Sequence, residues 1–242
     1  MSIAFKIFKR LLVSLFMLII IAVVAFLPWR IGSSGTPKSM EGIVPDSTLS
    51  ELYAQSGDLN MFKQDQRSIT SSEKSYGYFA ITDYTIIPDA DQIQTAVRYN
   101  NSTLQHTAED FGLDAPPSRE QDVYDVTLLI AIDTTPENKD DNLGNDPNGV
   151  RFVRCHGKTV ASEQKNLYNF RKIVFDLSEA QIDLSELIEQ ELLLAIYADF
   201  YYVGALDYSA EPYGTLCLYD FKSENVALKL SRKDKEALEQ FK

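Results

Sequence analysis

Hydrophobic positions are distributed very unevenly along the chain, and the densest run covers residues 11–27. Thirteen of these 17 residues are Leu, Ile, Val or Phe, and Ser14 is the only polar one. As a helix with a rise of 1.5 Å per residue, the run spans about 26 Å, close to the roughly 30 Å of a hydrocarbon core. With Trp29 as an interfacial residue and Pro28 as the expected end of the helix, we predict a single transmembrane helix over residues 11–29.

Basic residues around this run predict its orientation. Lys6, Lys9 and Arg10 precede it, whereas only Arg30 and the more distant Lys38 follow it. The positive-inside rule therefore predicts a cytoplasmic N-terminus (1–10) and an extracytoplasmic remainder, as in a signal anchor at the cell membrane.

A cleaved signal peptide is the alternative interpretation of the same run. Val23, Val24 and Ala25 resemble the small-residue pattern before a cleavage site, although the apolar core is long for a signal peptide. Both interpretations export residues 31–242.

Residues 30–74 are rich in Ser, Gly, Pro, Asp, Gln and Lys and have little apolar periodicity, so we predict a polar tether. Within it, Asp46 or Ser47 is suited to cap a short helix that ends at Gly57.

Apolar and aromatic residues alternate between turn-like clusters from residue 75 onward, which is typical of β-strands. In 91–99, for example, Ile93, Thr95, Val97 and Tyr99 share one face. Strands are predicted over 76–87, 91–99, 123–133, 150–155, 168–176, 191–203, 213–221 and 226–230.

Two helices accompany these strands. One is short and falls within 178–190, and the other is C-terminal, with Ser231 and Asp234 as a capping box. Because the pattern has no βαβ rhythm, we predict a mainly β ectodomain over 75–242, an antiparallel β-sandwich of Ig-like or jelly-roll-like type, in preference to a closed barrel.

Charge narrows the classes of partner. The formal net charge is −12, and residues 1–30 contribute +4, which leaves −16 for residues 31–242. Phosphate backbones repel such a surface, so nucleic acid is excluded as a partner. The charge fits either simple solubility or attraction to cations or to a basic partner.

Cysteine and histidine offer little catalytic chemistry. Cys155 and Cys217 either pair in an oxidising compartment or remain two separate buried thiols. Adjacent residues on a strand point to opposite faces, so Cys155 and His156 do not form a nucleophile–base pair. The sequence holds no zinc-binding spacing, nucleophile elbow or phosphate-binding loop.

The acidic stretch 133–149 is the candidate metal site. Asp140, Asp141, Asn142 and Asp146 supply the oxygen ligands that Ca²⁺ prefers, but Gly144 stands at the fifth place from Asp140, which breaks the EF-hand pattern. A solvated loop explains the same residues.

Aromatic residues crowd a later region. Exposed rings cover the apolar faces of sugars, whereas strands also favour aromatic residues for packing alone. A glycan-binding platform is therefore weighed against ordinary core residues for Tyr197, Phe200, Tyr201, Tyr202, Tyr208 and Tyr213.

These patterns predict a membrane-anchored extracytoplasmic binding or assembly module rather than an enzyme, with another envelope protein as the expected partner. The alternatives are a surface domain that binds or modifies glycans and an anchored Ca²⁺-binding domain.

Overall fold

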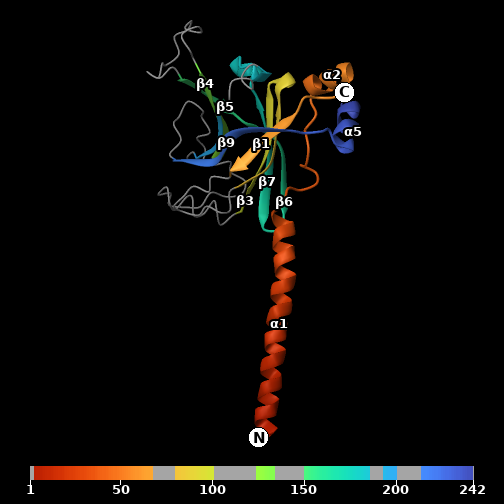
Figure 1. Ribbon diagram of the computed structural model, residues 1–242, viewed down its shortest axis with the longest axis vertical. Helices are drawn as coiled ribbons and strands as arrows, with labels where there is room; N and C mark the ends of the chain where they lie inside the picture. The colour runs from red at the N-terminus through yellow and green to blue at the C-terminus, as the bar shows by residue number, and fades with distance from the viewer. Residues whose placement is uncertain are drawn as a thin grey trace.

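A computed structural model of the chain describes residues 3–67, 80–100, 124–133, 150–185, 193–200 and 214–241. A long N-terminal helix, α1, projects from a β-rich domain, and the C-terminal helix lies on the flank of that domain (Figure 1). The protein is therefore mainly β and antiparallel with an N-terminal apolar helix, as predicted.

Helix α1 spans Ile3–Ser34 and is longer than the predicted segment. We expected Pro28 to end the helix, but α1 continues through it. Proline removes one backbone hydrogen bond, yet its fixed φ is compatible with a helix. Its stretch Ile7–Trp29 is long and apolar enough to cross a membrane, and the most apolar part of this stretch is not buried by any of the protein.

The described strands form one antiparallel sheet in the order β5-β4-β8-β9-β1-β2-β3-β7-β6. Their bounds are β1 Phe62–Arg67, β2 Ala80–Ile87, β3 Gln92–Tyr99, β4 Tyr124–Asp133, β5 Val150–His156, β6 Lys158–Lys165, β7 Tyr168–Asp176, β8 Leu193–Phe200 and β9 Gly214–Ala227.

The sheet has two halves, β5-β4-β8-β9-β1 and β2-β3-β7-β6, and in Figure 1 β4 and β5 lie to the left of β7 and β6. Strand β1 pairs with β9 through five residue pairs but with β2 only through Phe62 and Ile86. The two outermost strands, β5 and β6, follow one another directly in the chain, with Gly157 between them. The sheet thus bends back so that its first and last strands meet at one residue.

Gly157 makes this corner possible because no side chain fits there. A Cβ atom at this position would lie 2.4 Å from Ile173 Cγ2, 2.7 Å from the Val126 carbonyl oxygen and 2.8 Å from Phe175 Cε1. The Gly157 N–H donates to the same Val126 oxygen at 2.9 Å, which ties the corner to β4.

One hydrophobic core lies inside the bend. Leu128 from β4 and Ile196 from β8 belong to the same buried cluster as Ile86, Ile93 and Phe175 from the other half. The predicted inner face of β3 is confirmed, since Ile93, Val97 and Tyr99 are all in this core.

The predicted short helix is present as α2, Ser47–Ser56, with Asp46 as its N-cap and a left-handed Gly57 at its end. The predicted C-terminal helix is α5, Arg232–Gln240, and Ser231 and Asp234 form its capping box. The two helices pack together over a second apolar cluster that includes Leu49, Met61 and Leu238 (Figure 1, right).

Residues 30–74 differ from the expected polar tether wherever the structure describes them. Met40 and Ile43 are buried against the domain, and β1 stands in the middle of the sheet. The segment packs on the domain because its few apolar residues are buried and its polar residues bond to partners far away in the sequence. The apolar residues are too sparse to create a periodic pattern, so the sequence alone did not reveal this packing.

Two further details differ from the prediction. The predicted strand 213–221 continues without a break to Ala227 as β9, so 226–230 is not a separate strand, and β6 was not predicted at all. Within 178–190, where a short helix was predicted, the structure has a 3-10 helix, η3, Ser178–Ala180, and helical residues at Leu184 and Ser185, while residues 186–190 lie outside the described part. The strands described here do not confirm an Ig-like or jelly-roll-like topology.

Candidate functional site

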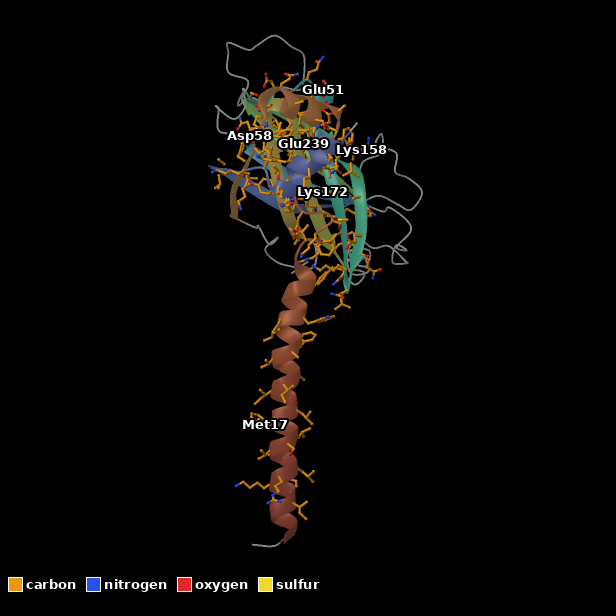
Figure 2. All side chains as sticks on the ribbon, turned by 90° about the vertical axis from the view of Figure 1, so that its right-hand side faces the viewer. Met17, Glu51, Asp58, Lys158, Lys172 and Glu239 are labelled. Atoms are coloured by element: carbon orange, nitrogen blue, oxygen red, sulfur yellow. The ribbon has the colours of Figure 1, made fainter. Side chains whose placement is uncertain are left out.

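Residues 36–46, which we call the strap, run from the end of α1 across the outer face of β2, β3, β7 and β6. Figure 2 views the domain from this side. Thr36 donates to Thr82 at one end of the strap, and Asp46 accepts from Gln92 Nε2 at the other. The strap covers a face of the sheet that would otherwise be open to water.

Strand register places a salt bridge beneath the strap. Ala96 of β3 pairs with Asp83 on one side and with Lys172 on the other. Because alanine leaves space above the sheet, Lys172 Nζ reaches over it to Asp83 Oδ2 at 3.2 Å. Lys172 Nζ also donates to the Gly42 carbonyl oxygen of the strap at 2.7 Å.

Lys172 has no solvent-accessible side-chain surface. Burial lowers its pKa below the ordinary lysine value, and the charge and hydrogen bond of Asp83 oppose that shift. A lysine with a lowered pKa is a typical catalytic base or nucleophile. Here the ammonium group is enclosed and bonded to the strap, so the arrangement supports a structural role in which Lys172 locks the strap to the sheet (Figure 2).

Gln94 makes the second lock between strap and sheet. Its amide group accepts from Val44 N at 2.6 Å and donates to the Val44 oxygen at 3.0 Å. The Gln94 side chain thus satisfies both backbone polar groups of Val44, as a neighbouring strand would, which explains why Gln94 is fully buried although it lies on the face opposite Ile93 and Val97.

A pocket of about 290 Å³ opens where the strap ends beside the corner of the sheet. It is lined by Val44, Pro45, Asp46, Gln92, His156, Lys158, Val160, Val174 and Asp176. Valine side chains from three segments line the pocket together with the charged residues Asp46, Lys158 and Asp176, so it suits one apolar side chain with a polar backbone beside it.

Strand β6 borders this pocket and is an edge strand. In the part of the chain that the structure describes, β6 pairs with β7 alone, and six of its eight residues are exposed. A register shift between Thr159 and Ala161 makes room for Val160, which lines the pocket. The backbone edge and the pocket therefore form one continuous surface.

The predicted site residues fall mostly outside this surface. Asp140, Asp141, Asn142 and Asp146, the predicted Ca²⁺ ligands, lie outside the described residues. Within the described ranges no group of three or more acidic, His or Cys side chains is suited to hold a metal ion. Of the predicted aromatic platform, only the Tyr197 side chain is described, and it is half-buried.

Cys155 and His156 point to opposite faces, as predicted. Cys155 belongs to the core, and His156 lines the pocket on the outside. Cys155 is a free thiol whose burial raises its pKa to about 11, which makes it a packing residue rather than a nucleophile.

No family model, curated protein or solved structure matches this chain. The candidate site therefore rests on its own geometry.

Sequence reasoning missed the strap, the pocket and β6. The sequence of β6, KTVASEQK, is polar on both faces, so it has no alternation to reveal a strand. One signal was present in the sequence: β6 is followed by Asn166, a residue type that favours turns. In the structure Asn166 has a left-handed φ of 55° and is the first residue of a two-residue turn between Lys165 and Tyr168.

Proposed function

We propose that this protein is a single-pass membrane protein whose β domain is an extracytoplasmic binding or assembly module. The observation that carries the proposal is the unburied apolar stretch Ile7–Trp29 of α1. As a helix it is about 35 Å long, enough to cross a hydrocarbon core of roughly 30 Å. An apolar surface of this length has no other part of the described chain to cover it.

The proposed orientation follows from charge. Lys6, Lys9 and Arg10 stand at the start of α1, so the N-terminus is on the cytoplasmic side and the β domain is on the other. The link between α1 and the strap is Gly35 alone, so the domain is held directly at the membrane rather than on a long tether.

The proposed binding site is the edge of β6 that pairs with no other described strand, together with the adjacent pocket. An extended segment can add to such an edge by backbone hydrogen bonds while one of its side chains enters the pocket. Since β6 runs between the end of α1 and the pocket, its proposed occupant is the extended juxtamembrane segment of another membrane protein. Lys158 and Lys165 at the ends of β6 oppose pairing with the same edge of a second copy.

The two halves of the sheet serve as the layers of a β-sandwich in this proposal. The single residue pair between β1 and β2 supports a division at that point, and the shared core between the halves supports face-to-face packing.

Substitution at Ser162 tests the edge. In a two-residue hairpin the residues flanking the turn exchange both backbone hydrogen bonds, so the outward backbone groups alternate along β6 and include those of Ser162. Ser162→Pro removes the outward N–H, and proline is tolerated on an edge strand. Ser162→Ala is the matched control, because it removes the hydroxyl and keeps the N–H.

Both variants are purified with wild type from membranes in mild detergent, and the bound proteins are compared by mass spectrometry. We expect a set of membrane proteins bound to wild type and to Ser162→Ala but lost from a folded Ser162→Pro. Equal recovery with all three chains would contradict the proposed site.

A further inference from the structure

The turn between β6 and β7 carries the most exposed apolar side chain of the described β domain. Leu167 is 61% exposed at the tip of a two-residue turn, a place where polar residues and glycine are usual. Asn166 provides the left-handed backbone that the turn requires, so Leu167 is not needed for its geometry. At this position Leu167 is accessible to an apolar surface outside the domain.

The position of the turn indicates which surface this is. Lys165 Nζ donates to the carbonyl oxygen of Gly35 at 3.1 Å, and Gly35 is the first residue after α1. Both views show the tip of the β6–β7 hairpin beside the end of α1 (Figures 1 and 2). The tip is therefore held next to the place where the helix emerges from the membrane.

Distances along α1 agree with a contact. Gly35 follows Trp29 by six residues, which is about 9 Å along a helix axis. The polar layer outside the hydrocarbon core is roughly 5 to 8 Å thick on each side. With Trp29 at the edge of the hydrocarbon core, Gly35 therefore lies just outside the polar layer. A loop that is fixed to Gly35 and points back along α1 reaches into the headgroups, where a leucine and a lysine are a favourable pair.

We infer that the β6–β7 turn is a second membrane contact, with Leu167 inserted between the lipid headgroups of the bilayer that α1 crosses. This inference rests on the proposed anchoring by α1. The second contact stops the domain from rotating freely about Gly35, and it holds the β6 edge upright on the membrane surface.

The test uses the fact that Trp29 is the only tryptophan of the chain. Full-length protein is reconstituted into nanodiscs of phosphatidylcholine and phosphatidylglycerol, with or without bromine on the acyl chains, and tryptophan quenching is measured. Wild type reports on α1 through Trp29. The double variant Trp29→Phe, Leu167→Trp reports on the turn, and Trp29→Phe, Val160→Trp reports on the far end of β6 as the control.

Expected results separate the two proposals. Brominated lipid should remove about half of the emission of Trp29 and of the tryptophan at position 167, and little from position 160. Quenching of Trp29 without quenching at position 167 would overturn the membrane contact and leave the anchor intact. No quenching of Trp29 would overturn the anchor, and the contact with it.

Discussion

Lys172 and Asp83 illustrate how a single pair determines whether the strap stays in place. The lysine is completely enclosed, whereas the Asp83 side chain is 29% exposed. Asp83→Ala should lower the free energy of unfolding by about 3 kcal/mol, because it leaves a buried ammonium group without its countercharge. Lys172→Met removes the charge itself and should cost only about 1 kcal/mol, mainly from the Gly42 oxygen left without its donor.

Urea unfolding of the full chain in detergent micelles measures both values. Equal losses, or a larger loss for Lys172→Met, would show that the pair does not carry a buried charge.

The same lysine predicts a dependence on pH. Its folded pKa is lowered by burial from the ordinary value of 10.5, so the unfolded state binds more protons between the folded pKa and 10.5. Stability from this group therefore rises with pH across that window. The difference in unfolding free energy between wild type and Lys172→Met should increase in favour of wild type from neutral pH toward 10.5. A difference that stays constant or falls would contradict the burial of a charged Lys172.

Gly157 determines whether the sheet can bend. Gly157→Ala forces a Cβ against Ile173 Cγ2 and the Val126 carbonyl oxygen, and the backbone contact cannot be relieved by a side-chain rotation. We expect a loss of about 2 kcal/mol in the free energy of unfolding. Gly35→Ala is the control, because no atom lies within 4 Å of its added Cβ, and it should leave the unfolding midpoint unchanged. Similar midpoints for both variants would mean that the corner is not tightly packed.

At the scale of elements, Asp234 connects α5 to the strap. Its carboxylate accepts from Ser231 N and Oγ in the capping box and from Ile43 N of the strap at 3.0 Å. Gly42 is needed beside it, since a Cβ there would lie 2.1 Å from Asp234 Oδ1 at a φ of +81°. One carboxylate thus caps the start of α5 and also holds the strap.

Asp234→Ala should therefore lower the free energy of unfolding by about 2 kcal/mol, from a lost helix cap and an unsatisfied backbone N–H. The matched control is Glu236→Ala on the same helix, which removes only an exposed pair with Arg232 and should change stability by less than about 0.5 kcal/mol. Thermal unfolding followed by circular dichroism compares the two. A Glu236→Ala effect as large as that of Asp234→Ala would refute the role of Asp234 as a connector.

Elements with local signals were the ones the sequence predicted well. Asp46 and Gly57 bound α2, Ser231 and Asp234 cap α5, and the inner face of β3 follows simple alternation. Each of these signals lies within a few residues of the element that it defines.

Elements fixed by distant partners were not predictable in this way. Gly42 is 130 residues from Lys172, and Ile43 is 191 residues from Asp234. The polar residues of the strap therefore resembled a solvated tether, and the pocket at its end was invisible. The candidate binding edge was missed because β6 is polar on both faces. An edge strand that faces water needs no apolar side, so its sequence shows no alternation.

On the scale of the whole molecule, α1 and the β domain are joined directly, with only Gly35 between the helix and the strap. The strap fixes the domain to the chain as it leaves α1, and the domain places β6 beside the same point. The proposed function requires that this domain stands outside the cytoplasm at the membrane surface.

Protease access to a C-terminal epitope tag tests this requirement most directly. The tag follows Lys242, close after α5, and its loss is followed by immunoblot on intact cells or spheroplasts and on lysed ones, with a cytoplasmic protein as the control. The account predicts that protease removes the tag from intact cells, that the control survives, and that the remaining N-terminal part stays in the membrane after alkaline washing. A tag that persists in intact cells and disappears only after lysis would contradict the account.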